Sequence, residues 1–170
     1  MNADLHEAAD LQHIADPQLR SEAARQWADE RRAALLATAH SFVSETVFSH
    51  PSKLSLMVKA QQSGFAVVLL VVCLDDTDIL LARVRQRVLE GGHDVPPERV
   101  LARYPRTLQN LSKAVRQADM ALLYDTGSRG KNQVSPPMRI AVCQGLTTKI
   151  LVKTLPEWAR IVLGGEGVLG

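Results

Sequence analysis

The stretch Phe65–Leu74 (FAVVLLVVCL) decides the fold, because it is a run of ten apolar residues with no polar position. A strand with one wet face alternates apolar and polar residues, whereas a strand covered on both faces is apolar throughout. The run is far shorter than the roughly 20 residues that a membrane-spanning helix needs. The pair Ser63-Gly64 just before it is typical of a helix end. We therefore predict a strand covered on both faces that follows a helix.

The sequence on both sides of this run alternates between helical and strand-like patterns. Asp16-Pro17 is a helix start, with a capping carboxylate before a proline at the first helical position. Helices are expected over residues 16–39, 51–64, 77–92, 98–118 (interrupted near Pro105) and 156–163, and strands over 41–46, 65–74, 120–125, 138–144 and 148–154. Such alternation implies βαβ crossovers. We expect one α/β domain over residues 1–170, with a mostly parallel sheet flanked by helices.

Composition limits the classes of binding partner and indicates the cellular location. The net charge of +2 and the 4% aromatic content favour neither a nucleic-acid partner nor a membrane partner. The polar N-terminus MNADLHEAAD is not a signal peptide, which predicts a cytoplasmic protein. Cys73 and Cys143 lie in separate apolar runs without metal-ligand spacing, so we expect two structural thiols and no metal site at cysteine.

Acidic residues stand at the ends of three predicted strands. Glu45-Thr46, Asp75-Asp76 and Asp125 close the strands SFVSET, VVLLVVCL and MALLYD. In open α/β sheets, ligands bind at the carboxyl ends of the strands. These carboxylates are therefore suited to hold a magnesium ion or to orient a hydroxyl, and the alternative is that they are solvated.

Arginines concentrate on the predicted helical hairpin over residues 77–118. Their spacing of three or four places them on common helix faces, at Arg83, Arg87, Arg99, Arg103 and Arg106. Arginines on an amphipathic helix are commonly solvated or paired with neighbouring carboxylates. The alternative is a lid, since phosphoryl transfer needs several guanidinium groups to meet the charge on the transferred group.

Asp4 and Glu45 are the candidate acid–base groups. A kinase commonly uses one carboxylate to accept the proton of the attacking hydroxyl. Asp4 has a second interpretation as the N-cap of a helix over LHEAADL. The glycine patterns at 127–132 and 165–170 do not provide a phosphate-binding loop, because the first has the wrong spacing and no helix follows the second.

Several segments together resemble one family. SFVSETVFSHPSKL, then ARVRQRVLEGGHDVPPERVLARY, then LLYDTGS, preceded by MNADLHEAA, are similar to the zeta toxin family of P-loop kinases, in particular its small bacterial UDP-N-acetylglucosamine kinases. The resemblance covers the chain to about residue 128. It implies transfer of the γ-phosphate of ATP, with magnesium, to a hydroxyl of a nucleotide sugar such as UDP-N-acetylglucosamine.

The resemblance also implies roles for particular residues. Asp4 falls on the family's general base, and Glu45 and Thr46 fall on the residues that hold the substrate. The lid arginines that steady the transferring phosphate would come from a set of three, Arg83, Arg87 and Arg103. The family further implies an antitoxin as partner.

The sequence departs from the family in one respect. It contains no G-x-x-x-x-G-K-[ST] loop, so the residues that would bind the ATP phosphates are unassigned. We expect a domain that is N-terminally incomplete and inactive as a kinase in the form given, with a sheet surface that an antitoxin or self-association covers. The alternative is a non-catalytic remnant that binds a partner or a nucleotide sugar.

Overall fold

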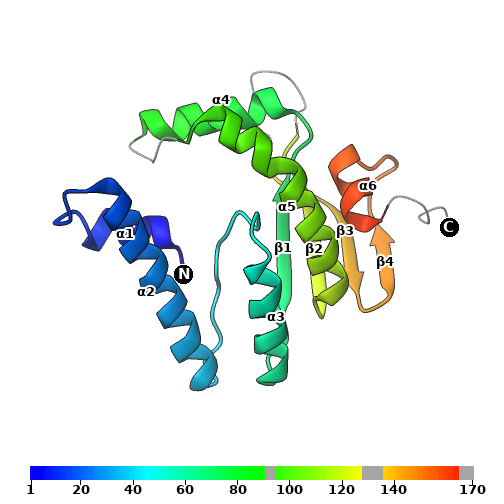
Figure 1. Cartoon of the computed structure of the whole chain (residues 1–170). Helices are drawn as coiled ribbons and strands as arrows, with labels where there is room; N and C mark the ends of the chain where they lie inside the picture. Colours follow the sequence, from blue (N-terminus) through cyan, green and yellow to red (C-terminus); the bar gives the residue numbers. More distant parts are fainter. Residues whose placement is uncertain (91–94, 128–135, 165–170) are drawn as a thin grey trace. The chain divides into compact units, whose positions relative to one another are not determined.

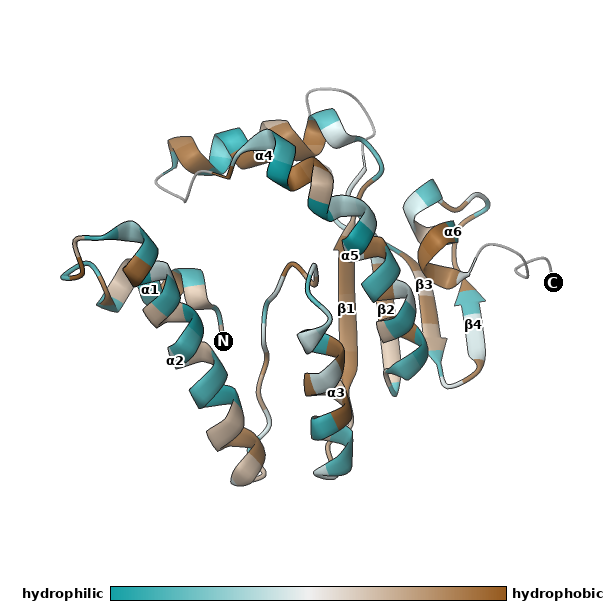
Figure 2. Cartoon of the chain, viewed as in Figure 1, coloured by the Kyte–Doolittle hydropathy of each residue, from teal (hydrophilic) through white to brown (hydrophobic). Residues whose placement is uncertain are grey.

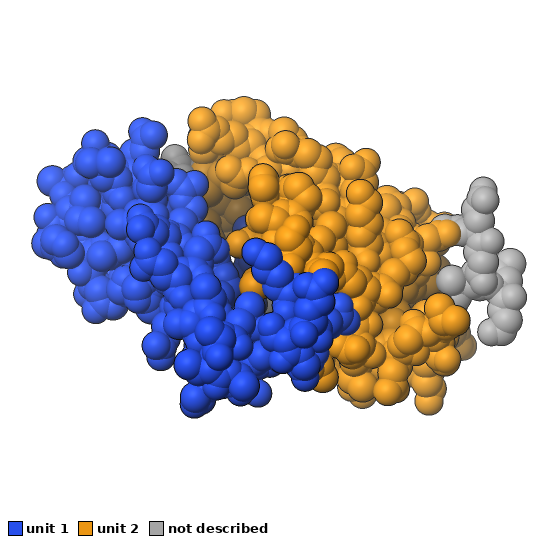
Figure 3. Space-filling model, turned by 60° about the horizontal axis from the view of Figure 1, so that its bottom comes forward, with its two compact units in different colours: residues 1–47, 59–65 blue, residues 48–58, 66–170 orange. Residues whose placement is uncertain are grey.

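The computed structural model describes residues 1–90, 95–127 and 136–164. The chain divides into two compact units, coloured separately in Figure 3. Unit 1 comprises residues 1–47 and 59–65, and unit 2 comprises residues 48–58 and 66–170. Among the described residues, no helix is both long and apolar enough to cross a membrane.

Unit 1 is built on two helices, α1 (Ala3–Asp10) and α2 (Pro17–Ala37), joined by a short loop. Asp16 caps α2 as the sequence predicts, because its side chain accepts hydrogen bonds from the backbone N–H groups of Gln18 and Leu19. The buried Glu7 ties the helices together, since its carboxylate accepts from Arg20 Nε at 3.3 Å and from Ser21 Oγ at 3.0 Å. This pairing satisfies a charge that would otherwise be costly to bury.

The segment that follows α2 is not a strand, so the prediction for residues 41–46 is wrong. Within unit 1 it forms a bridge with Met1, whose N-terminal amine donates to Val43 O and whose carbonyl accepts from Glu45 N at 3.0 Å. A strand needs a continuing ladder on at least one side. Among the described residues this pair of bonds is not extended into such a ladder, and the alternation of SFVSET alone does not create one.

Unit 2 contains a four-stranded sheet in the order β1-β2-β3-β4. Its strands are β1 (Val68–Cys73), β2 (Met120–Asp125), β3 (Met138–Gln144) and β4 (Thr147–Ile150). Within the described ranges, β1 and β2 are parallel and the other two pairings are antiparallel. The α/β fold is confirmed, but the sheet is mixed rather than mostly parallel. A physical reason is visible at Gly145, whose φ of +57° allows the tight turn that joins β3 to β4 as a hairpin.

The remaining helices are α3 (Ser52–Gln62), α4 (Thr77–Leu89), α5 (Pro97–Gln117) and α6 (Glu157–Leu163). In unit 2, α5 and α6 pack against one face of the sheet (Figure 1), around the fully buried Trp158 and Leu123. The predicted interruption of α5 at Pro105 is wrong, because the helix continues through it. The predicted end of the preceding helix at Gly91-Gly92 lies outside the described residues, and α4 itself ends at Leu89.

The prediction that β1 is covered on both faces is also wrong. Leu69, Val71 and Cys73 face the helical core, and Val71 is only 3% exposed. On the opposite face, Val68, Leu70 and Val72 are 52%, 62% and 59% exposed. The apolar run was long enough to predict the strand but did not show which of its faces the helices cover.

Candidate functional site

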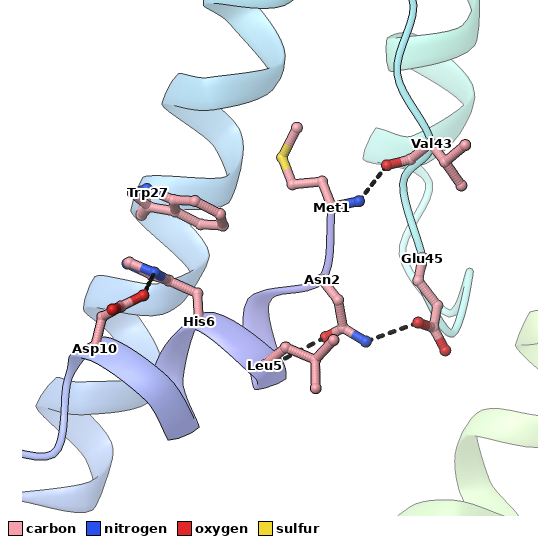
Figure 4. Close-up of a pocket in the computed structure, with 8 residues that line it drawn as sticks. All are labelled: Met1, Asn2, Leu5, His6, Asp10, Trp27, Val43 and Glu45. Carbon is pink, nitrogen blue, oxygen red and sulfur yellow. Dashed lines mark hydrogen bonds and ion pairs between the residues drawn. The ribbon is translucent and has the colours of Figure 1, made fainter.

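Unit 1 contains a pocket of about 470 Å³ beside the start of α1. Its lining combines carboxylates, an amide and two aromatic rings with aliphatic side chains, as Figure 4 shows: Met1, Asn2, Leu5, His6, Asp10, Trp27, Val43 and Glu45. This size lies in the range of small-molecule sites. The lining of this concavity is of mixed polarity.

Asn2 connects the helix start to the pocket wall. Its Oδ1 accepts from the backbone N–H of Asp4 at 2.9 Å and of Leu5 at 3.3 Å, so Asn2 is the N-cap of α1. Its Nδ2 donates to Glu45 Oε2 at 2.7 Å. One side chain thus fixes both the helix and the Glu45 carboxylate, and the remaining oxygen, Glu45 Oε1, is available to a ligand donor.

His6 is held in place by two neighbours. Its Nδ1 lies 2.7 Å from Asp10 Oδ2, one turn further along α1. Its ring stacks on Trp27 of α2, with centroids 3.8 Å apart and planes inclined by 16°. Because a carboxylate only accepts hydrogen bonds, Nδ1 carries the proton and Nε2 becomes the acceptor of the neutral ring. Figure 4 shows the imidazole between Asp10 and the indole.

The pocket suits a ligand with hydroxyl groups and a flat or ring-shaped body. Glu45 and His6 present acceptors, which hydroxyl donors satisfy, and the aromatic pair His6–Trp27 offers an apolar surface against which a ring can pack. The described lining residues include neither lysine nor arginine. The lining therefore offers hydrogen-bond acceptors beside an apolar ring surface.

The residues predicted for this site are only partly brought together. Glu45 lines the pocket. Asp4 is exposed on the first turn of α1 and is not among the lining residues, and because Asn2 is the cap, the N-cap interpretation of Asp4 is wrong. Thr46 is exposed and follows Glu45 outside the lining. Sequence reasoning missed Asn2, His6 and Trp27, although the i,i+4 spacing of His6 and Asp10 was a usable signal.

The carboxylates at the ends of β1 and β2 have structural partners in unit 2. Asp75 accepts from the backbone N–H groups of Glu157 at 2.8 Å and Trp158 at 2.6 Å, and so caps α6. Asp125 Oδ1 accepts from Trp158 Nε1 at 2.8 Å, and Asp76 caps α4. The sequence left three roles open for these carboxylates, namely holding a magnesium ion, orienting a hydroxyl or being solvated. The structure shows a different role, because they hold helices in place.

The three lid arginines belong to unit 2, whereas Asp4 and Glu45 belong to unit 1. Arg83 is bound within the fold, since its Nη1 and Nη2 donate to Thr126 Oγ1 and Thr126 O, both at 2.8 Å. Arg87 on α4 is exposed, and Arg103 on α5 is partly buried. Arg83 therefore anchors α4 to the carboxyl end of β2.

The end of β1 also contains a thiol and a phenol. Tyr104 of α5 donates to Leu74 O at 2.6 Å, and its hydroxyl lies 3.9 Å from Cys73 Sγ. Burial raises the pKa of the Cys73 thiol, and burial together with the nearby Cys73 raises the pKa of Tyr104. Both groups are therefore neutral at physiological pH, and Cys73 is not an activated nucleophile. Cys143 is buried, as the sequence predicts.

The described residues do not bring together a group that would hold the magnesium ion implied by the resemblance. No cluster of three histidine, cysteine or acidic residues in those ranges can hold a metal ion. The carboxylates nearest to such a role, Asp75 and Asp125, are bound to α6. The glycine pattern at 165–170 and all but Gly127 of the pattern at 127–132 lie outside the described residues.

Comparisons of the chain with protein-family models, with curated proteins and with solved structures found no match. The functional assignment therefore depends on the residues and on the geometry given above.

Proposed function

We propose that this chain is a zeta-toxin-like domain that binds a nucleotide sugar such as UDP-N-acetylglucosamine in the pocket of unit 1. The observation that carries the proposal is the placement of Glu45. The residue that the resemblance assigns to the substrate lines a pocket of suitable size, and Asn2 fixes its carboxylate at 2.7 Å.

The remaining lining supports the same class of ligand. Hydroxyls of a sugar or ribose donate to Glu45 and to Nε2 of His6, while a ring packs against the aromatic pair. The diphosphate would lie outside the pocket, because neither lysine nor arginine lines it.

Phosphate transfer from ATP is the second candidate function. It is supported by the resemblance and by the arginines of α4 and α5, including Arg87 and Arg103. Against it, Arg83 is bound to Thr126, and the sequence lacks the loop that would hold the ATP phosphates. We therefore favour the binding function, and expect no measurable transfer to UDP-N-acetylglucosamine by the 170-residue chain.

Glu45→Gln tests the binding function. Removing the negative charge weakens the hydrogen bond to a ligand hydroxyl, and a bond to a charged acceptor contributes about 1.5–3 kcal/mol. We expect the affinity for UDP-N-acetylglucosamine to fall about tenfold or more. Isothermal titration calorimetry on the full chain measures this directly.

The matched control is Glu22→Gln, which removes the same charge from an exposed position on α2 in the same unit. Its affinity should equal that of the unchanged chain. ATP should give no binding heat, and the candidate transfer reaction is followed separately by release of ADP. The binding function is wrong if the nucleotide sugar gives no heat at millimolar concentration, or if the two glutamine variants bind equally well.

A further inference from the structure

Strand β1 is an edge strand with an unusual surface. Among the described residues it pairs with β2 on one side only. Figure 2 shows it as apolar along its length, and Val68, Leu70 and Val72 on its open face are each more than half exposed. Natural edge strands usually contain charged residues, proline or a bulge, and these features prevent pairing with another chain. The sequence VLLVVC has none of these residues, and no bulge interrupts its pairing with β2.

The direction of the backbone groups defines what the free edge can bind. The carbonyls of Val67 and Cys73 point to β2, since they accept from Asp119 N at 3.1 Å and Thr126 N at 2.9 Å. Successive residues of a strand point their backbone groups to opposite sides. The N–H and C=O groups of Val68, Leu70 and Val72 therefore point to the free edge, where three residues offer six bonds.

Charge decides the direction of a partner strand. Asp75 and Asp76 follow the carboxyl end of β1. If two copies of this strand paired in parallel, the acidic pairs would lie side by side and repel each other. An antiparallel pair places them at opposite ends, and the strand itself has no charge to oppose its own copy.

We propose that the free edge of β1 pairs with β1 of a second copy of this chain, antiparallel and about a two-fold axis at Leu70. In this register Leu70 lies opposite Leu70 of the second copy, and Val68 lies opposite Val72. All six outward backbone groups of each copy are then paired, and the open faces of both copies lie on the same side. Within unit 2, helices α5 and α6 lie on the other face of the sheet (Figure 1).

The expected dimer is reversible rather than permanent. A single strand pair buries less than the roughly 800 Å² per partner of a standard interface. The extended apolar face of the eight-stranded sheet adds cross-strand contacts such as the Leu70 pair. The dimer should therefore form in the micromolar range and dissociate on dilution.

Sedimentation velocity over a concentration series tests the proposal, with Leu70→Lys as the variant. A lysine at the centre of the edge places two like charges opposite each other, so the dissociation constant should rise at least tenfold. Because Leu70 is 62% exposed, the variant should stay folded, which circular dichroism verifies. The control is Leu146→Lys in the β3–β4 turn, a leucine that is more exposed than Leu70 and lies away from this edge.

Cross-linking tests the register. In a background with both cysteines changed to alanine, Leu70→Cys should be joined by a short bismaleimide, because opposite Cα atoms lie about 5.5 Å apart. Val68→Cys should not be joined, since two such positions are about 13 Å apart along the strands. A chain that is monomeric at all concentrations, a dimer unaffected by Leu70→Lys, or equal cross-linking at both positions would overturn the proposal.

Discussion

Replacing Trp158 with alanine is expected to lower the free energy of unfolding of unit 2 by about 3–5 kcal/mol. The side chain is fully buried at the start of α6 and is the largest in the core. Its removal leaves a cavity between α6 and the sheet and deprives Asp125 Oδ1 of its indole partner at 2.8 Å. Urea denaturation followed by circular dichroism measures the loss.

Trp158→Phe separates the two contributions. Phenylalanine keeps most of the apolar contact but has no N–H, so Asp125 is left without this donor. The expected loss is about 1 kcal/mol, because Asp125 is partly buried and loses one hydrogen-bond donor. A Trp158→Ala protein that unfolds within about 1 kcal/mol of the unchanged chain would show that α6 is not part of the core.

The second large effect is expected at Asp75. Its carboxylate replaces the missing side-chain cap of α6, which begins after Pro156 without a cap of its own. Asp75→Ala should cost about 1–2 kcal/mol, as other N-cap replacements do. The same denaturation experiment applies, and the exposed Asp78→Ala on α4 is the control, with an expected change within about 0.5 kcal/mol. Equal losses in both variants would refute a capping role for Asp75.

In these two expectations, the acidic residues at the strand ends have a structural role. Sequence reasoning predicted correctly that Asp75 follows a strand and that Asp125 ends one, because apolar runs and their polar ends are local features. Their partners were not predictable, since Trp158 lies 83 residues from Asp75 and 33 from Asp125 along the chain. A carboxylate at the end of a strand is equally suited to a ligand and to a helix N-terminus, and only the fold decides between them.

Helix starts and ends were predictable for the same local reason. Asp16-Pro17 and Ser63-Gly64 mark real boundaries, and Gly64 has the positive φ of +84° that this position requires. The antiparallel direction of β3 relative to β2 and the lack of a strand at residues 41–46 were not predictable. Both depend on which strands become neighbours, and alternation within one segment does not contain that information.

One lining residue of the candidate pocket was predicted from the sequence. Glu45 was a candidate from its predicted strand end and from the resemblance, whereas Asn2, His6 and Trp27 come together only because α1 packs against α2. The stacking of His6 on Trp27 joins positions 21 residues apart. Spacing alone could have paired His6 with Asp10, but not with the indole.

The most direct test of nucleotide-sugar binding uses the two tryptophans of the chain. Trp27 lines the pocket of unit 1, and Trp158 is buried in unit 2, so their indole N–H signals report on different places. In a ¹⁵N-labelled chain, with the signals assigned by Trp→Phe variants, saturating UDP-N-acetylglucosamine should shift the Trp27 signal and leave that of Trp158 in place. An unchanged Trp27 signal, or a shift of Trp158 alone, would contradict binding in this pocket.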